Sequence, residues 1–227
     1  MKLIIIIVAI VAIGILYYLM GSNLKELEKI AKDSELNEIA SKYPENKKIC
    51  ETILRMLGNN KTSIDEKLES DATLYIAIQN KILIGNTHQS FTRIQTIAHE
   101  CLHSIQDRKI LLFNFFYSNI YFIYWFVICI LTIFNKNMNE LIYSNILLIL
   151  SLIYYAVRVF LENDAMIKAK YLAKEFMEEL KISSDEEIDK IIKSYEKLND
   201  MGIKTVNYQL MLETLIKVII LAIAFLI

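Results

Sequence analysis

Apolar and polar residues follow one another along this chain in long blocks, and the blocks predict its architecture. Four predominantly apolar stretches cover residues 1–20, 110–134, 141–161 and 207–227. Each is close to or above the roughly 20 residues that an α-helix needs to cross the hydrocarbon core of a bilayer. We therefore predict a mainly α, multi-pass membrane protein with four transmembrane helices in contact with the lipid bilayer.

The first and the last apolar stretches each have a second interpretation. The first could be a cleaved signal peptide, but its apolar run is longer than a usual signal core, and no small-residue cleavage site follows it. The last contains Glu213 and Lys217, which stand four residues apart on one helical face and could form an ion pair. If this stretch does not span, it would be an interfacial helix whose tail alone enters the lipid.

Four crossings place residues 21–109 and 162–206 on one side of the membrane, and both termini with residues 135–140 on the other side. The two long polar segments contain 13 and 8 Lys and Arg residues, whereas the opposite side has only Lys2 and Lys136. Positively charged segments next to membrane spans stay preferentially in the cytoplasm. We therefore predict that both polar segments are cytoplasmic.

The polar segments show helical periodicity, interrupted by one region with the character of a β-hairpin. Two short runs rich in aliphatic and β-branched residues, 73–78 and 82–84, flank a turn. The helices that we expect around this hairpin cover about residues 23–43, 49–57, 90–109, 162–180 and 183–202, and the third of them continues without a break toward the second apolar stretch. The polar segments should thus form a small α+β domain.

Composition and charge exclude several classes of protein. Hydrophobic residues make up 55% of the chain and there is a single proline, which is unlike a soluble globular domain. The 25 basic and 26 acidic residues give a net charge of −1, so the chain lacks the basic character of a nucleic-acid-binding protein. Its three cysteines are widely spaced with no CxxC pair, which excludes a disulfide framework and a thiolate zinc cluster. Nucleic acid is therefore not an expected partner.

The expected helix that begins near residue 90 contains His99-Glu100-Cys101-Leu102-His103, an HExxH motif. Residues four apart on an α-helix lie about 40° apart around its axis and about 6 Å apart along it, so both imidazoles can reach one metal ion. Histidines at this spacing are typical zinc ligands, and Glu100 between them is the natural general base. The alternative is an ordinary helix whose histidines face solvent or satisfy neighbouring groups. Cys101 points about 160° away from His103, so we expect it to be a small buried core residue rather than a ligand.

A catalytic zinc ion usually has three protein ligands, so a third ligand must come from elsewhere in the chain. The metzincin extension of the motif requires Gly at position 106 and His at position 109, where this chain has Gln106 and Lys109. The remaining histidine, His88, lies in an expected loop, where it could stabilise a substrate oxyanion or simply be exposed to solvent. A carboxylate is therefore the better candidate for the third ligand.

Glu162 and Asp164 follow directly after the third apolar stretch, on the same side of the membrane as the motif. The short connection between the second and third stretches predicts an antiparallel helical hairpin, whose two ends on one side lie about 8–10 Å apart. Glu162 can then complete the site with His99 and His103, although a first-turn acid that favours a helix dipole is its alternative role. Asp164 is the second candidate, either as a ligand or as a hydrogen-bond acceptor for a ligating histidine.

The order of these features resembles the YugP-like family of membrane zinc metallopeptidases. The resemblance covers nearly the whole chain: an N-terminal span, short helices, a hairpin, HExxHxxQ at residues 99–106, a membrane hairpin and then Glu-x-x-Ala at residues 162–165. It implies that the two motif histidines and Glu162 are zinc ligands and that Glu100 is the catalytic base. The chain is more distantly similar to HtpX-type and CAAX prenyl proteases, but Met166 stands where those proteins have an aspartate.

These features together predict an integral-membrane metalloendopeptidase that binds one Zn²⁺ ion and hydrolyses peptide bonds of membrane or membrane-adjacent proteins. Two imidazoles and a carboxylate can also hold Fe(II) or Co(II). The alternative function is a non-catalytic membrane adaptor, in which a closed, four-ligand metal site joins the two polar segments. The presence of Glu100 favours the enzyme, because a structural metal site has no use for a base at that position.

Overall fold

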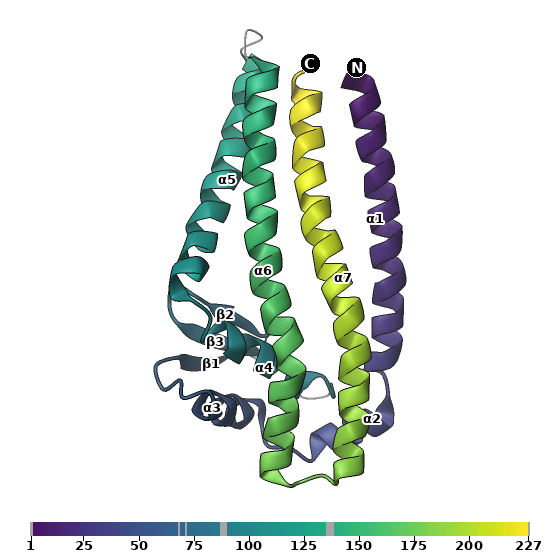
Figure 1. Cartoon of the computed structure of the whole chain (residues 1–227), viewed down its shortest axis with the longest axis vertical. Helices are drawn as coiled ribbons and strands as arrows, with labels where there is room; N and C mark the ends of the chain where they lie inside the picture. Colours follow the sequence, from purple (N-terminus) through teal and green to yellow (C-terminus); the bar gives the residue numbers. More distant parts are fainter. Residues whose placement is uncertain (1, 68, 71, 87–89, 135–138, 227) are drawn as a thin grey trace. The chain divides into compact units, whose positions relative to one another are not determined.

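The computed structural model describes residues 2–67, 69–70, 72–86, 90–134 and 139–226. This part of the chain contains seven helices and three strands (Figure 1). In chain order they are α1 (Lys2–Ala31), α2 (Ser34–Ser41), α3 (Asn46–Met56), β1 (Ser63–Lys67), β2 (Leu74–Ile76), β3 (Lys81–Gly85), α4 (Arg93–His103), α5 (Arg108–Phe134), α6 (Glu140–Leu180) and α7 (Asp185–Ala224). The chain forms two compact units. The apolar unit consists of Met1–Asn23, Phe113–Phe160 and Lys204–Ile227, and the polar unit consists of Leu24–Leu112 and Leu161–Ile203.

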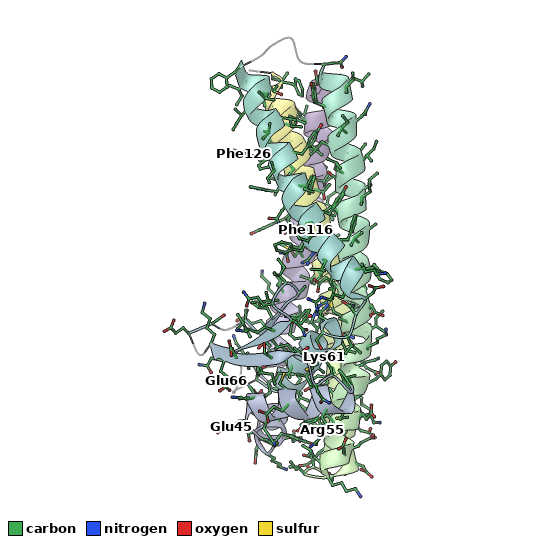
Figure 2. The ribbon with its side chains drawn as sticks, turned by 90° about the vertical axis from the view of Figure 1, so that its left-hand side faces the viewer. Glu45, Arg55, Lys61, Glu66, Phe116 and Phe126 are labelled. Carbon is green, nitrogen blue, oxygen red and sulfur yellow. The ribbon has the colours of Figure 1, made fainter. Side chains whose placement is uncertain are left out.

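Four of the helices, α1, α5, α6 and α7, are long and apolar enough to cross a membrane. Together with the small sheet, they confirm the predicted fold class of a mainly helical, multi-pass membrane protein. Large apolar side chains on these helices point outward, as Phe116 and Phe126 of α5 do with 58% and 51% exposure (Figure 2). An apolar surface of this extent is the kind that lipid covers.

Inside the apolar unit, polar contacts join the helices around two tyrosines. Tyr121 is fully buried, and its hydroxyl is hydrogen-bonded to Ser151 Oγ at 2.8 Å. The ammonium of Lys217 lies 4.3 Å from the centroid of the Tyr121 ring, and the Tyr154 hydroxyl donates to Glu213 at 3.3 Å. Among the ion pairs of the described residues there is none between Glu213 and Lys217, although their spacing would allow one. Each of the two charges has an aromatic partner on a neighbouring helix instead, which satisfies it inside the bundle.

The polar unit is built on α3 and α4, which pack together and against the small sheet (Figure 1). The strand order is β1-β3-β2, with β1 parallel and β2 antiparallel to β3. The predicted hairpin is confirmed as β2 and β3. The additional strand β1 was not predicted, because four of its five residues are exposed and it lacks the alternation of a half-buried strand.

The core of the polar unit combines side chains from both of its sequence segments. Its fully buried residues include Ile49, Ile53, Phe91, Ile94, Ile97, Ala173, Phe176, Met177, Ile191 and Tyr195. Burying an aliphatic or aromatic side chain of this size contributes roughly 1.5–3 kcal/mol. The two segments, which are far apart in sequence, are thus held together by a shared core.

Two helices that were predicted to be continuous are interrupted. The predicted helix over residues 23–43 ends at Ala31, because the side chain of Asp33 accepts two backbone N–H groups and caps a new helix, α2. The predicted continuous helix from residue 90 into the second apolar stretch is also wrong. α4 ends at His103, and Asp107 accepts a backbone N–H in the first turn of α5. The HExxH helix is therefore a separate, short element.

Three helices continue where an end was predicted. α1 runs without a break from the first apolar stretch through residues 21–23 to Ala31. α6 runs without a break from the third apolar stretch into the polar residues that follow, and α7 continues through Gly202. Gly202 lies opposite Met166 of α6, and a Cβ at position 202 would be only 2.8 Å from Met166 Cε. The glycine leaves room for this contact between α6 and α7, instead of ending a helix.

Candidate metal centre

The helix α4 is fixed in the polar unit by its apolar face and by a buried arginine in its first turn. Ile94, Ile97 and Cys101 on one face are fully buried. Arg93 is 3% exposed, and its two terminal nitrogens donate four hydrogen bonds of 2.8–2.9 Å. The acceptors are the carbonyl oxygens of Ala40, Tyr43 and Pro44 and Oδ1 of Asn46. This arrangement leaves the opposite face of α4, with both motif histidines, free to form a site.

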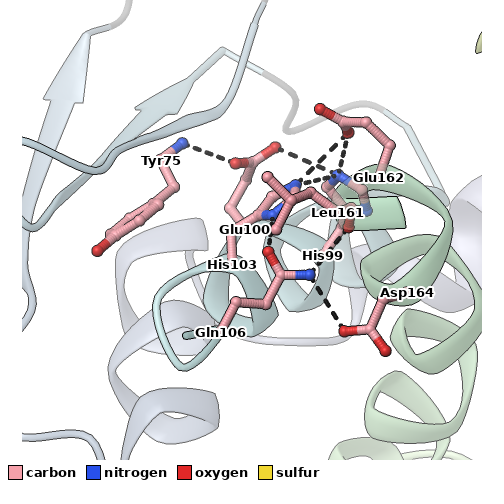
Figure 3. A network of polar contacts seen from close by, with 8 residues as sticks. All are labelled: Tyr75, His99, Glu100, His103, Gln106, Leu161, Glu162 and Asp164. Carbon is pink, nitrogen blue, oxygen red and sulfur yellow. Dashed lines mark hydrogen bonds and ion pairs between the residues drawn. The ribbon is translucent and has the colours of Figure 1, made fainter. Parts of the chain in front are cut away.

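His99, His103 and Glu162 come together in the polar unit (Figure 3). The Nε2 atoms of the two histidines are 3.0 Å apart, and each lies 3.5 Å from Oε2 of Glu162. The two imidazole rings are nearly perpendicular, at 89°. The three residues could therefore hold a metal ion between two ring nitrogens and a carboxylate oxygen.

The spacing of these atoms fits a small divalent cation. Zinc binds histidine nitrogen and carboxylate oxygen at about 2.0–2.2 Å with tetrahedral geometry, which places neighbouring ligand atoms about 3.3 Å apart. The observed separations of 3.0 and 3.5 Å bracket this value. Burial disfavours a charged ring at His103, but the carboxylates of Glu162 and Glu100 outweigh it and raise the pKa of His103. The site thus attracts positive charge, and a bound metal ion would take the place of the proton.

Gln106 determines which nitrogen of His103 faces the site. Its Nε2 donates to the carbonyl oxygen of Leu161 at 2.9 Å and to Asp164 Oδ2 at 3.1 Å. Its Oε1 is therefore the acceptor for Nδ1 of His103, at 2.8 Å. A neutral imidazole with its proton on Nδ1 has its lone pair on Nε2, the nitrogen that points toward His99 and Glu162.

Glu100 lies beside the three residues without belonging to the group. Its side chain is buried, and Oε2 accepts the backbone N–H of Tyr75 at 2.6 Å, while Oε1 is 4.0 Å from His99 Nε2 (Figure 3). Burial raises the pKa of Glu100, partly opposed by the two nearby histidines and by the Tyr75 N–H. A buried carboxylate with a raised pKa next to a metal site is suited to accept and return a proton.

Cys101 is directed away from the centre, as predicted. It is fully buried, and its Sγ lies 3.7 Å from Sγ of Cys50 on α3. Burial raises the pKa of the Cys101 thiol well above its usual value, which disfavours the thiolate needed for metal binding. Cys101, the residue after Glu100, therefore belongs to the core.

The predictions for the two remaining site residues, Asp164 and His88, compare differently with the structure. Asp164 is outside the three-residue group and is linked to His103 through Gln106, and its role as the alternative ligand stays a prediction. His88 lies outside the described residues. Two contacts were not predicted. A sequence gives no signal for the Tyr75 N–H, whereas Gln106 already stood in the HExxHxxQ pattern, three residues after His103, without an assigned role.

The centre combines two imidazole nitrogens, one carboxylate ligand and one adjacent buried carboxylate. Within the described ranges, the metal group contains these three ligands and no fourth. This donor set leaves a coordination position for a non-protein ligand, which distinguishes catalytic from closed structural zinc sites. Comparison with known proteins found no matching family model, no similar curated protein and no similar solved structure.

Proposed function

We propose that this protein is an integral-membrane, zinc-dependent metalloendopeptidase of the YugP-like type, with its active site in the cytoplasm. The observation that carries the proposal is the convergence of His99, His103 and Glu162 with a buried Glu100 beside them. An open three-ligand site next to a general base is what metal-assisted hydrolysis requires. A structural adaptor would need the ligands and would have no need for Glu100.

In the proposed reaction, different residues bind the metal, transfer the proton and orient a ligand. Zinc bound by the three ligands would polarise the scissile carbonyl and lower the pKa of the attacking water. Glu100 takes a proton from that water and later gives it to the leaving amine, for which its raised pKa is suited. Gln106 keeps Nε2 of His103 free to bind metal.

The edge of β2 offers a place for an extended peptide. In the part of the chain that the structure describes, the sheet order is β1-β3-β2, and no strand pairs with the outer edge of β2. The N–H of Tyr75 donates to Glu100 instead of to β3. A peptide can add to such an edge by backbone hydrogen bonds, largely independent of its sequence. We therefore favour a protein or peptide substrate over a small molecule.

Zinc is the favoured ion, and membrane-adjacent proteins are the favoured substrates. Two imidazoles and one carboxylate at tetrahedral spacing suit Zn²⁺, with Fe(II) and Co(II) as chemically acceptable alternatives. Glu162 is the first residue after the third apolar stretch, and α5 begins five residues after His103, so both halves of the site adjoin candidate membrane spans in sequence. The 13 and 8 Lys and Arg residues of the polar segments, compared with Lys2 and Lys136 on the opposite side, support a cytoplasmic site.

The proposal is tested with detergent-solubilised protein by measuring bound zinc and the hydrolysis of an unfolded protein substrate. Glu100→Gln should keep its zinc and lose at least about 100-fold in activity, because only the proton transfer is removed. The matched control is Glu175→Gln, an exposed glutamate on α6, which should behave like the unmodified chain. Zinc binding without hydrolysis in the unmodified chain, or equal activity in Glu100→Gln, would reject the enzyme and favour the adaptor.

The ligand set has a separate test. Glu162→Ala should fold but lose bound zinc, because two histidines alone bind the ion weakly. Circular dichroism shows whether the variant is folded, and metal analysis shows its zinc content. Full zinc occupancy in Glu162→Ala would assign the third ligand to another acid, with Asp164 the first to test.

A further inference from the structure

Next to the metal centre, the polar unit contains a pocket of about 460 Å³ that the proposed mechanism does not use. The pocket and the centre share two residues. The side chain of Gln106, which holds His103, forms part of the pocket wall. Tyr75 contacts Glu100 through its backbone N–H and lines the pocket with its side chain, which points away from the centre in Figure 3. An extended chain advances about 3.3 Å per residue, so a group in the pocket belongs to a residue close to the scissile bond.

A connected set of hydrogen bonds fixes the wall of this pocket. Oδ1 of Asn80 accepts from the Tyr75 hydroxyl at 2.9 Å and from Thr62 Oγ1 at 3.0 Å. Nδ2 of Asn59 donates to Thr62 Oγ1 and to Ser104 Oγ at 2.9 and 2.8 Å. Asn80 has a φ of +49°, a left-handed conformation that asparagine tolerates better than most residues. The turn after β2, the segment before β1 and the end of α4 are thereby joined, so the pocket is preformed.

The charges that line the pocket are of one sign. Lys61 and Arg108 contribute an ammonium and a guanidinium, and none of the described residues that line the pocket is acidic. Within the part of the chain that the structure describes, neither cation is in an ion pair, whereas Lys42 and Lys81 are paired with Glu187 and Asp65. Leu57, Ile105 and Leu111 add apolar surface to the same pocket. A ligand with an aliphatic stem and a carboxylate end would satisfy both parts of this lining.

We propose that this pocket is a specificity subsite that receives an acidic side chain of the substrate. The inference rests on the proposed peptidase function. A substrate strand paired with the open edge of β2 directs alternate side chains to the face of the sheet on which the Tyr75 ring lies. One of these side chains enters the pocket, and its carboxylate binds between Lys61 and Arg108. The enzyme should therefore select glutamate or aspartate next to the bond that it cleaves.

Binding can be measured without catalysis in the full-length Glu100→Gln protein, loaded with zinc in detergent. The probes are fluorescein-labelled, otherwise neutral ten-residue peptides with one glutamate at successive positions, and matched peptides with glutamine instead. At the position that reaches the pocket, fluorescence anisotropy should show at least about tenfold tighter binding of the glutamate peptide. Lys61→Gln/Arg108→Gln should lose this preference. Lys47→Gln/Arg55→Gln, which removes two exposed charges of α3 outside the pocket, should keep it.

Equal affinity for the glutamate and glutamine peptides at every position would overturn the inference, as would a preference that survives in Lys61→Gln/Arg108→Gln. A lipid headgroup is the competing occupant. If short-chain phosphatidylglycerol binds and the pocket variant loses lipid binding while it keeps the peptide preference, the pocket belongs to lipid and the inference is wrong. Hydrolysis by the zinc-loaded, unmodified chain separates the two proposals. Cleavage without acidic preference rejects the pocket alone, and preferential binding without cleavage rejects the peptidase alone.

Discussion

Gln106 connects both ligand-bearing segments of the metal centre through one side chain. Its amide oxygen accepts from Nδ1 of His103, and its amide nitrogen donates to the carbonyl of Leu161, the residue before Glu162. The same nitrogen donates to Asp164, whose other oxygen lies 2.5 Å from Lys168 Nζ. A partner of this kind orients a metal ligand and stabilises the tautomer that binds the ion.

We expect Gln106→Ala to bind zinc about 10–100-fold more weakly, because the His103 ring loses its orientation and the Leu161 carbonyl loses its donor. Competition with a chromogenic chelator in detergent measures the dissociation constant. Gln79→Ala, an exposed glutamine in the turn between β2 and β3, is the matched control and should leave the affinity unchanged. An unaltered dissociation constant in Gln106→Ala would show that the hydrogen bonds do not support the site.

The residues of the centre that the sequence predicts are those whose spacing along the chain brings them together. His99 and His103 are four residues apart, and the geometry of any α-helix brings them to one face. Glu162 was a candidate because it follows an apolar stretch that predicted a return to the same side of the membrane. The contact between Tyr75 and Glu100 is made by a backbone N–H, which every residue except proline possesses, so no residue pattern could indicate it.

Among the elements, the glycines of β3 and α7 tolerate an added side chain to different degrees. A Cβ at Gly85, the last residue of β3, would lie 2.6–2.7 Å from backbone atoms of Ser70 and Ala72. A Cβ at Gly202 within α7 would meet only the terminal methyl of Met166. Backbone atoms cannot move without disturbing the sheet, whereas the end of a methionine side chain can rotate away.

Gly85→Ala should therefore destabilise the polar unit by about 2 kcal/mol or more, since the clash forces the backbone apart. Gly202→Ala should change stability by no more than about 1 kcal/mol, because the gain in helix propensity offsets the displacement of Met166. Denaturant unfolding followed by circular dichroism compares the two variants with the unmodified chain. A larger loss for Gly202→Ala than for Gly85→Ala would contradict this assignment.

Element boundaries were less predictable than element types. A change from apolar to charged residues near position 161 suggested the end of a helix, but α6 continues through it, because helix propagation depends on the backbone and not on the polarity of the exposed face. The opposite error occurred after His103, where α4 ends although no glycine or proline follows. The side chain of Asp107 accepts a backbone N–H and starts a new helix there. Such a side-chain hydrogen bond competes with continuation of the preceding helix, and the spacing of apolar residues does not indicate it.

The proposed position of the site in the cell depends on how often the chain crosses the membrane. α7 decides the number, because its last part is either a span that brings the C-terminus to the opposite side or an interfacial helix that does not. It is one of the four helices with sufficient length and hydropathy to cross. Glu66 on β1 is exposed in the polar unit (Figure 2), and Leu226 is 53% exposed near the chain end, so each can carry a cysteine as a label.

In intact cells, a membrane-impermeant maleimide should label Leu226→Cys and should label Glu66→Cys only after permeabilisation. The reason is the proposed cytoplasmic location of the polar segments, which hold 13 and 8 of the 25 Lys and Arg residues. The unmodified chain, whose three cysteines are buried, gives the background. Protection of both positions would make α7 interfacial and leave three crossings. Labelling of Glu66→Cys alone from outside would reverse the orientation, and the candidate peptidase would then face extracytoplasmic proteins with its metal geometry unchanged.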